Sequence, residues 1–514
     1  MAGLKFLVDT NVFIALEDPK IVSSSAAELA QKAQLHSVAL FLDEATFDDV
    51  SRDNDPVRRA ITLSKLRKFP ALQDVVHRRH DELEQRFGAI RNDNDRCDVL
   101  MLDTLDLNVV DFLITEDIEI HKRAARASLH RRVFTVREAL LWLQRTFEPQ
   151  EFRLPFIEAR KAHQLDVRDT LFDSLREDYR DFDTWFAKCR REHRDCWSVE
   201  IDGQLAGVVI WKAENRVEAK PLSDGDRVLK VCTFKMKEEY QGEKFGEQLL
   251  KKILWFAQTN HYDVVYLTVF PKHQFLVELI SAFGFRHTRT ERTGEYFMER
   301  SMTLDDAQFV AERSTVLQAD FGAYPRFYDG PNVDKYIVPI RPEFHAVLFP
   351  EIAEFEPLPL FPDEHLLRAR WYNDRTPGNT IRKVYVCRSP TRSLQSGDVL
   401  VFYLSKSDQY TRSQSATTIG VVERVSLAND GDQLIRFVGR RSVFSQETLQ
   451  ALAPSEKSPV LVIDFLLNGH LDPAVSLEDL LSIGAFANRP SQSIKRLDES
   501  AYRQIRSIVR LSFE

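Results

Sequence analysis

The sequence contains no hydrophobic run long enough to cross a bilayer. It begins with a short apolar stretch that Asp9 interrupts, which is not the pattern of a secretory signal. Cysteine is scarce: the five cysteines are scattered, with no Cys-x-x-Cys pair and no histidine at the spacing of zinc ligands. These absences argue against a membrane partner, a disulfide framework and a structural zinc site. We therefore expect a cytoplasmic protein with reduced thiols.

The chain also lacks internal repeats and low-complexity tracts. Its 514 residues are too many for one hydrophobic core and suggest roughly three domains. A hydrophobic content of 43% and a charged content of 29% are ordinary for a soluble multidomain protein. The net charge of -8 argues against nucleic acid covering the whole surface, although it allows a local basic groove.

The first block, residues 1–149, alternates short apolar segments with charged ones, which predicts an α/β domain with a parallel sheet. Strands are expected at Lys5–Val8, Ser37–Leu42, Val109–Thr115 and Val133–Thr135. Helices are expected between them, including Asp74–Phe87 and Arg96–Leu105.

Four acids stand out in this block. Asp9 and Asp117 each follow an apolar strand, and sites in parallel sheets lie beyond the carboxyl ends of the strands. Asp49 and Asp98 lie on predicted helices. Carboxylates that converge raise one another's pKa unless a cation neutralises them. Mg²⁺ or Mn²⁺ prefers such oxygen ligands and can activate water for phosphodiester hydrolysis.

A simpler reading also stays open, in which these acids are helix caps and solvated charges. Asp49 is the least certain of the four, because Glu44 and Asp48 are close enough in sequence to take its place.

The segments Val8–Val12 and Leu113–Asp117, together with Asp49 and Asp98, resemble a PIN domain. The resemblance implies a doubly wound nuclease that cuts RNA with Mg²⁺ or Mn²⁺. A homo-oligomer formed through this domain is a further expectation. It makes catalytic residues and metal ligands of Asp9, Asp49, Asp98 and Asp117. Thr10, Asn11 and Thr115 would then orient ligands or phosphate.

The second block, residues 152–302, has an α+β pattern. Asp202-Gly203 is a strong hairpin turn between two apolar strands. Further on, the sequence predicts strands at Val228–Met236 and Val264–Phe270, and helices at Gly246–Gln258 and His273–Ala282.

A glycine-containing loop, Gln241 to Gly246, joins the strand at Val228–Met236 to the following helix. Glycines there let the backbone approach a pyrophosphate, to which the amides at a helix start can donate. An ordinary turn and helix cap is the alternative.

This loop, the strand Tyr266–Val269 and the turn Phe283–Phe285 resemble GNAT acetyltransferases. The resemblance implies acetyl-CoA as co-substrate. It places cofactor contacts at Phe234, Met236, Gln241, Gly242, Lys244, Phe245, Gly246 and Glu247.

The sequence departs from the GNAT pattern at three positions. Lys244 stands at the middle glycine of the loop, and Ile280 stands where many members carry a tyrosine proton donor. His273 replaces the usual asparagine, and we expect it to cap a helix or be partly buried. The candidate replacements for the missing acid are Tyr266, Tyr296 and a water held by Glu238 or Glu239.

A Pro-rich connector, residues 303–362, precedes a mainly β third block, residues 363–514. Within the connector, Ile337–Ile340 is predicted to be extended. The strands of the third block, one of them expected at Gln433–Gly439, are similar to PUA-like barrels such as the ASCH group. That similarity implies binding of RNA or a modified base, although the ASCH signature is missing.

Basic and aromatic residues of the third block could form a groove for RNA. They are Arg382, Lys383, Arg388, Arg392, Lys406, Arg412, Tyr403, Tyr410 and Phe444. Solvated strand edges over an aromatic core are an equal alternative, and we assign Phe402 and Phe437 to the core.

Together these features predict a metal-dependent ribonuclease joined to an acetyl-CoA-dependent N-acetyltransferase that acts on RNA or an RNA-associated amine. Two alternatives stay open. One is an acetyltransferase with a structural PIN domain, and the other is a non-catalytic regulator that senses acetyl-CoA.

Overall fold

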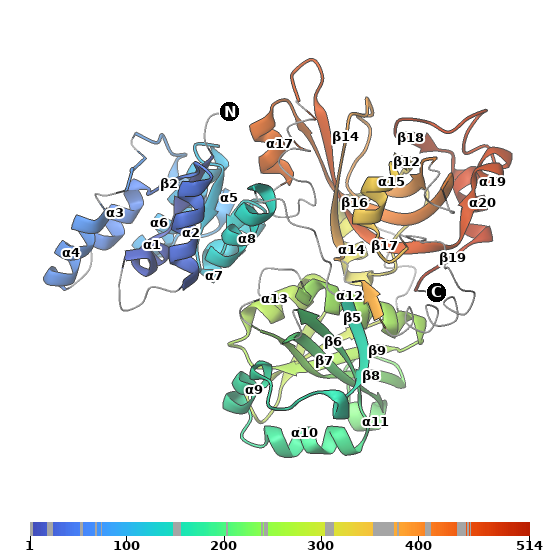
Figure 1. Ribbon diagram of the computed structural model, residues 1–514, viewed down its shortest axis with the longest axis horizontal. Coiled ribbons are helices and arrows are strands. Elements are labelled where there is room, and N and C mark those ends of the chain that lie inside the picture. The colour runs from blue at the N-terminus through green and yellow to red at the C-terminus, as the bar shows by residue number, and fades with distance from the viewer. Residues whose placement is uncertain are drawn as a thin grey trace, which may run out of the picture. The chain divides into compact units, whose positions relative to one another are not determined.

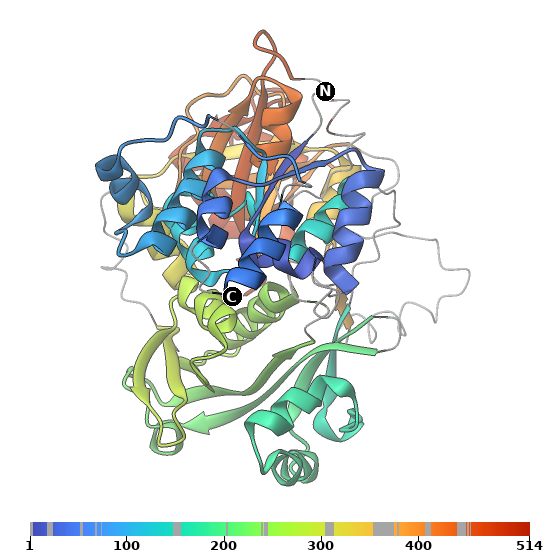
Figure 2. The ribbon, with the colours of Figure 1, turned by 90° about the vertical axis from the view of Figure 1, so that its left-hand side faces the viewer.

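The computed structural model forms two compact units, shown as ribbons in Figures 1 and 2. Unit 1 comprises Met1–Glu151 and Leu427–Val462, and unit 2 comprises Phe152–Ser426 and Ile463–Glu514. The described residues are 4–17, 24–51, 55–66, 69–72, 74–147, 156–201, 204–237, 240, 245–303, 313–352, 375–377, 380–406, 413–438, 449, 452 and 454–513. Among the helices in these ranges, none combines the length and the apolar character needed to span a membrane.

Unit 1 is built on a parallel sheet, as the sequence predicts, and its strand order is β2-β1-β3-β4. Its strands are β1 (Lys5–Val8), β2 (Ala39–Phe41), β3 (Phe112–Ile114) and β4 (Val133–Phe134). The central strands β1 and β3 are almost continuously buried, because helices cover both faces of the sheet.

The helices of unit 1 pack on the sheet in two layers. On one face, Phe6, Phe112 and Phe134 meet Trp142, whose ring centroid lies 4.7 Å from that of Phe112. On the other face, the leucines of α6 pack against Leu7 and its neighbours. The helices are α1 (Thr10–Glu17), α2 (Ser24–Leu35), α3 (Glu44–Ser51), α4 (Pro56–Leu66), α5 (His80–Phe87), α6 (Asp93–Asp106), α7 (Ile118–Arg126), α8 (Val136–Phe147) and α17 (Gly431–Val438).

The predicted helix Asp74–Phe87 is wrong in its first half, since α5 begins only at His80. Asp74 has a left-handed backbone with φ of 58°. The buried carboxylate of Asp103 then accepts from the backbone N–H of Arg78 at 3.1 Å and contacts the ring of His77 at 3.1 Å. These contacts hold the segment on α6 in a non-helical form.

The predicted strand Gln433–Gly439 is also wrong, because this region forms helix α17. The Asp430 carboxylate accepts from the backbone N–H of Gln433 at 2.7 Å, which favours a helix start. The buried side chains Leu434, Ile435 and Val438 then lie on one helical face. Phe437, assigned to the core from sequence, is only partly buried.

The first sheet of unit 2 has eight strands in the order β10-β11-β9-β8-β7-β6-β5-β13. Neighbouring strands are antiparallel except β8 and β9, which run parallel. They are β5 (Phe156–Lys161), β6 (Asp195–Ile201), β7 (Gln204–Asn215), β8 (Arg227–Met236), β9 (Val264–Val269), β10 (Arg286–Thr290), β11 (Tyr296–Ser301) and β13 (Arg375–Pro377).

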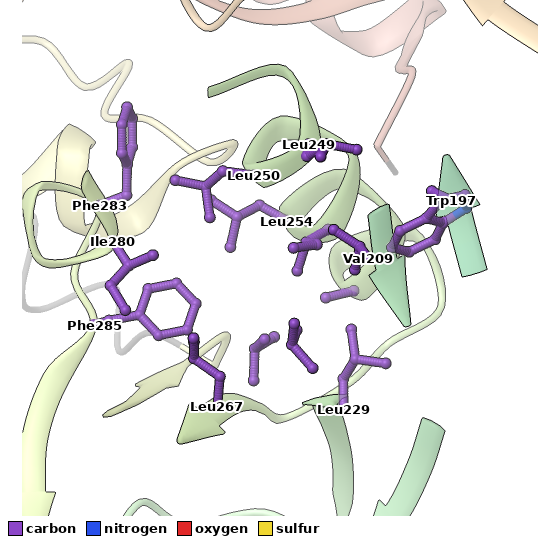
Figure 3. Packing of buried hydrophobic residues seen from close by; sticks show 14 of the residues in the cluster. Trp197, Val209, Leu229, Leu249, Leu250, Leu254, Leu267, Ile280, Phe283 and Phe285 are labelled. Carbon is purple, nitrogen blue, oxygen red and sulfur yellow. The ribbon is translucent and has the colours of Figure 1, made fainter. Parts of the chain in front are cut away.

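Helices cover both faces of this sheet. Figure 3 shows Leu249, Leu250 and Leu254 of α12 directed into a core that includes Leu229 and Leu267 of the sheet. The opposite face packs against phenylalanines of η2 and α10. The helical elements are η1 (Ala162–Gln164), η2 (Thr170–Phe172), α9 (Asp173–Asp178), α10 (Phe182–Arg191), α11 (Arg216–Ala219), α12 (Phe245–Thr259) and α13 (Gln274–Ala282).

The second sheet of unit 2 has the order β14-β17-β16-β15-β12-β18, with β19 paired to β17. The extended form predicted for Ile337–Ile340 is confirmed, since this segment belongs to β12, between β15 and β18. The strands are β12 (Lys335–Ile340), β14 (Arg382–Cys387), β15 (Val399–Leu404), β16 (Ser415–Ala428), β17 (Val460–Ser476), β18 (Lys495–Leu497) and β19 (Arg510–Leu511). The helices beside them are α14 (Arg313–Ala323), α15 (Pro342–Leu348), α19 (Leu477–Ser482) and α20 (Glu499–Ile508).

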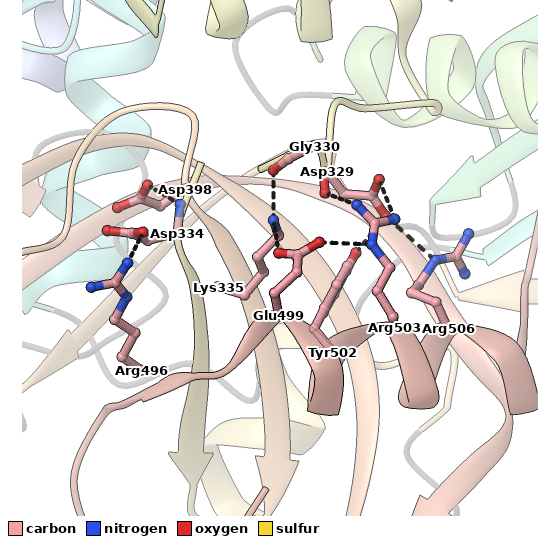
Figure 4. Close-up of polar contacts among 10 residues, drawn as sticks. All are labelled: Asp329, Gly330, Asp334, Lys335, Asp398, Arg496, Glu499, Tyr502, Arg503 and Arg506. Carbon is pink, nitrogen blue, oxygen red and sulfur yellow. Dashed lines mark hydrogen bonds and ion pairs between the residues drawn. The ribbon is translucent and has the colours of Figure 1, made fainter. Parts of the chain in front are cut away.

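A buried lysine ties α20 to β12. Figure 4 shows the Lys335 ammonium, whose side chain is 2% exposed, donating to the Glu499 carboxylate and the Gly330 carbonyl oxygen, both at 2.6 Å. Arg503 extends this network from Glu499 to Asp329. Because each charge has a partner, the network satisfies the ionic groups it removes from water.

Helix α12 also contacts the second sheet of unit 2. The Trp255 indole N–H donates to the Tyr324 hydroxyl at 2.8 Å, and that hydroxyl donates to the Leu467 carbonyl at 2.8 Å. Lys251 forms an ion pair with Glu351, with both side chains buried. These contacts give α12 a partner on each side.

The predicted basic groove is wrong for two of its members. Lys383 is buried, and burial lowers its pKa to about 7. Tyr403 is also buried, with its ring edge-on to Phe486. Phe402 is core, as predicted. Three further groove candidates, Arg412, Tyr410 and Phe444, lie outside the described residues.

We expect Glu351→Gln to lower the free energy of unfolding of unit 2 by about 3 kcal/mol or more, because it leaves the Lys251 ammonium buried without its counter-charge. Urea unfolding followed by tryptophan fluorescence measures this change. Glu343→Gln on α15 is the control, since the Glu343 side chain is 58% exposed. Equal effects of the two substitutions would contradict the prediction.

Candidate functional site

The two parallel strands of the first unit 2 sheet part from each other. β8 and β9 are paired only over Val228–Lys230 and Val264–Tyr266, although β8 continues to Met236 and β9 to Val269. Two positions beyond this pairing, the β7–β8 register shifts and leaves Cys232 without an opposite residue. Such a bulge bends a strand. The strand edges therefore diverge and turn backbone N–H and C=O groups toward the space between them.

Helix α12 starts close to the open end of this gap. Its first-turn N–H groups have no partners within the helix, which makes a helix start a favourable place for an anion. An added Cβ at Gly246 would approach Leu279 of α13 at 3.3 Å, so a small residue keeps the two helices close. Phe234 and Met236 are half-buried against the core, and Phe245 is buried.

The side chain of Glu247 is already engaged, since it accepts from the backbone N–H of Arg382 at 2.7 Å. It can serve a ligand only through its backbone amide. Gln241, Gly242 and Lys244 lie outside the described residues, as do Glu238 and Glu239.

The segment from Asp169 to Tyr179 connects the far ends of β8 and β9. At its start, the Asp169 carboxylate lies 3.6 Å from the ammonium of Lys237, which directly follows β8. At its end, the Tyr179 ring packs 5.3 Å from that of Phe270, which directly follows β9. Elements η2 and α9 thus span the diverging strand ends.

His273 and Asp178 form a pair at the end of β9. The His273 Nε2 lies 2.8 Å from the Asp178 carboxylate, and no described residue hydrogen-bonds its Nδ1. Burial alone would raise the pKa of Asp178, but hydrogen bonds from Lys272 and His273 outweigh burial and lower it. His273 stands at the N-cap position of α13, where its side chain makes no capping hydrogen bond, and it is partly buried, as predicted. The pairing could not be read from the sequence, because its members lie 95 positions apart.

The structure also describes Ile280 and the two tyrosines considered as proton donors. Ile280 is buried in the core and has no titratable group. The Tyr266 hydroxyl donates to Glu214, its ring stacks on Phe297, and burial raises its pKa. The Tyr296 ring lies against His287, with centroids 4.1 Å apart.

In unit 1, Thr115 links two of the predicted acids at the carboxyl edge of the sheet. Its hydroxyl donates to the Asp9 carboxylate at 2.6 Å and accepts from the backbone N–H of Asp117 at 2.9 Å. The Asp117 carboxylate also caps α7 by accepting from the Glu119 N–H at 2.7 Å. Thr10 donates its backbone N–H to Asp9 at 2.6 Å, and Asn11 is exposed.

Asp98 joins this group electrostatically. Burial raises its pKa to about 7, and the negative charges of Asp117 and Asp9 add to the increase. The side chain of Asp49 lies outside the described part of the chain. Among the described side chains, no group of three or more Asp, Glu, His or Cys is arranged to hold a metal ion. The metal site therefore stays a prediction.

Residues 159–285 match the model of the acetyltransferase (GNAT) family, so this part of the chain is a GNAT domain, as its sequence motifs suggest. No curated protein sequence matches the chain. The PIN resemblance and the PUA-like barrel stay predictions.

Several solved structures are similar to parts of the chain. One is ASCH from Zymomonas mobilis (TM-score 0.24, 13% identity, 34% of this chain and 96% of that chain). Another is PaiA N-acetyltransferase from Thermoplasma acidophilum in complex with coenzyme A (TM-score 0.22, 17% identity, 28% and 98%). A third is an N-acetyltransferase from Staphylococcus aureus Mu50 (TM-score 0.24, 14% identity, 29% and 98%). At these values the likenesses assign neither an activity nor a residue role.

Proposed function

We propose that the GNAT domain transfers an acetyl group from acetyl-CoA to an amine. The observation that carries this proposal is the divergence of β8 from β9 beside the start of α12, inside the region that the family model matches. Strand edges that have lost their pairing offer N–H and C=O groups to an extended ligand, as an added strand would use them.

The residues present fit acetyl-CoA in two ways. Backbone groups around Phe234 and Met236 would hold the pantetheine chain at the β8 edge. Amides from Gln241 to Glu247 would hold the pyrophosphate at the start of α12. Gly246 lets α12 approach α13 closely, which supports a narrow site. Bound there, acetyl-CoA supplies a thioester that an amine can attack.

The chain must also accept a proton from the attacking amine. We assign this role to His273, because its Nδ1 is unpartnered among the described residues and Asp178 fixes the ring from the other side. The Asp178 carboxylate would stabilise the imidazolium that forms, as an orienting acid does in other histidine bases. Ile280 cannot supply this chemistry.

A regulator that binds acetyl-CoA without turnover is the competing function. It shares the binding site but has no use for the His273–Asp178 pair, so binding and turnover must be measured separately.

We expect Gly246→Asp to weaken acetyl-CoA binding by roughly tenfold or more, because the new carboxylate would repel the phosphates at the helix start. Isothermal titration with acetyl-CoA measures the change. Gly246→Ala tests the added bulk alone, and Thr259→Asp places the same charge at the exposed far end of α12. Equal losses in Gly246→Asp and Thr259→Asp would contradict this location of the site.

We expect His273→Gln to reduce kcat by about 10²-fold or more while leaving the Kd for acetyl-CoA nearly unchanged. Release of CoA thiol in the presence of a panel of amines measures turnover, and titration measures binding. His287→Gln on β10 is the control. A wild-type protein that binds acetyl-CoA but turns over no amine would favour the regulator.

We also propose that unit 1 is a metal-dependent ribonuclease of the PIN type. The observation that favours it is the nearness of Asp9 and Asp117 to Asp98, whose pKa is raised first by burial and then by the charges of these two acids. These acids, with Asp49, would bind Mg²⁺ or Mn²⁺, which supplies an activated water and neutralises their repulsion. An acetyltransferase with a structural PIN domain is the alternative.

We expect Asp9→Asn/Asp117→Asn to reduce metal-dependent RNA cleavage by roughly 10²-fold or more, since a metal held by carboxylates loses two of its ligands. Cleavage of total RNA with Mg²⁺ or Mn²⁺, against a chelator, measures the activity. Asp81→Asn on α5 is the control, because its side chain is 71% exposed. No metal-dependent cleavage by folded wild-type protein would overturn the nuclease proposal.

A further inference from the structure

A small basic pocket lies beside the acidic edge of unit 1. It has a volume of about 300 Å³ and is lined by residues that include Gly88, Arg91, Asp95, Lys122, Arg123 and Arg126. This set is called the α7 pocket below. Neither proposed activity uses these residues.

The pocket wall on α7 follows from the helical repeat. Lys122, Arg123 and Arg126 are spaced at i, i+1 and i+4, and Glu119 precedes them by one turn, so all four lie on one side of the helix. The opposite side carries the buried Ile120 and Ala124. Burial of the apolar side fixes the charged side toward the pocket.

Arg123 holds the loop that forms the other wall. Its guanidinium donates to the carbonyl oxygens of Gly88 at 3.2 Å and Ala89 at 3.0 Å, and it pairs with Asp95 at 3.0 Å. Gly88 has φ of 96°, which favours glycine, and an added Cβ would lie 3.0 Å from the Arg126 guanidinium. The hydrogen bonds of Arg123 and the backbone of Gly88 therefore hold this wall of the pocket in place.

The remaining charges are unevenly balanced. Asp95 is paired with Arg123, and Glu119 is paired with Lys122 at 2.7 Å. The side chains of Arg91 and Arg126 have no hydrogen-bond or ion-pair partner among the described residues. Two guanidinium groups therefore face one pocket without neutralising acids. A guanidinium binds phosphate through two parallel hydrogen bonds, which suits it to this ligand.

The pocket and the acids share the same two helices. Asp95 lines the pocket, and Asp98 stands one turn later on α6. Asp117 caps the start of α7, and Arg126 ends it, about 14 Å further along the axis. A nucleic-acid strand with one phosphate at these acids can continue along α7 into the pocket.

We propose that the α7 pocket binds the phosphate backbone of a nucleic-acid strand and positions that strand for the acids of unit 1. The positioning role of the pocket rests on the proposed nuclease function. Its binding of RNA can be tested independently, because binding can be measured without cleavage. Contacts to phosphate position a strand without reading its sequence.

The test uses the full-length chain and a fluorescently labelled single-stranded RNA, with chelator present to stop cleavage. Anisotropy titrations between about 50 and 200 mM salt give the affinity and its salt dependence. We expect Arg91→Ala/Arg126→Ala to weaken binding by roughly tenfold and to reduce the slope of log K against log salt by about 1.4, or about 0.7 for each lost phosphate contact.

Matched variants separate charge from folding. Arg79→Ala removes one exposed arginine at the N-cap position before α5 and should leave the affinity within about twofold. Arg126→Lys keeps the charge and should retain most of the binding that Arg126→Ala loses. An unchanged affinity and slope in the double variant would overturn the proposal, as would losses in Arg79→Ala equal to those of Arg126→Ala.

Two competitors identify the source of the phosphate. Inorganic phosphate at matched ionic strength should displace the RNA only weakly, whereas strong displacement would make this a site for free phosphate and overturn the proposal. Polyglutamate should not compete, and equal competition would show a general anion surface instead.

Failure of the pocket and failure of the nuclease give different results. Asp9→Asn/Asp117→Asn should still bind RNA through the α7 pocket. If RNA binds through Arg91 and Arg126 but wild-type protein never cuts it, the nuclease proposal fails and the pocket stands. If RNA is cut while both arginines are dispensable for binding, the pocket fails and the nuclease stands.

Discussion

Helix α12 is packed on two sides, and the organisation of unit 2 depends on this packing. Its leucines enter the core of the eight-stranded sheet (Figure 3), while Lys251 and Trp255 contact Glu351 and Tyr324 on the other side. A helix held on two sides presents its first turn in a fixed position. Because anion binding at a helix start relies on oriented amides, the second sheet supports the proposed acetyl-CoA site.

This support comes from outside the region that the GNAT family model matches. The match ends at residue 285, whereas Tyr324, Glu351 and Arg382 contact α12 from later in the chain. The polar groups on this side of α12, in the ion pair and in the backbone hydrogen bond to Glu247, have these partners only when the later residues of unit 2 are present. The acetyltransferase domain of this chain is therefore structurally joined to the residues that follow it.

Unit 1 poses a different electrostatic problem, because it places like charges close together at one sheet edge. The Thr115 hydroxyl donates a hydrogen bond to the Asp9 carboxylate, and an amide at the start of α7 donates one to the Asp117 carboxylate. Asp98 is left with a raised pKa, because burial and then the negative charges of Asp117 and Asp9 disfavour its ionised form. The charge changes sign at Arg91, just before α6, and at Arg126, the last residue of α7. This arrangement of opposite charges suits a ligand that carries phosphate groups at regular intervals.

Periodicity and turn chemistry were sufficient to predict much of the architecture. The alternation of apolar segments predicted the parallel sheet of unit 1, and β1 has the bounds expected from sequence. The strand, loop and helix around Gln241–Gly246 pointed to the GNAT domain that the family model matches. These features are local, because a strand, a helix start or a glycine turn is determined by residues close to it in the chain.

What the sequence could not decide depends on contacts between distant residues. Asp103 prevents residues 75–79 from forming a helix, and the burial of Lys383 and Tyr403 removes them from the expected groove. His273 gains its partner from α9, and the gap between β8 and β9 opens beside a one-residue bulge of β8 in its pairing with β7. In each case the deciding energy comes from burial or from an ionic contact that exists only in the folded chain. Local propensity carries no information about such a contact, so only the tertiary structure determined these features.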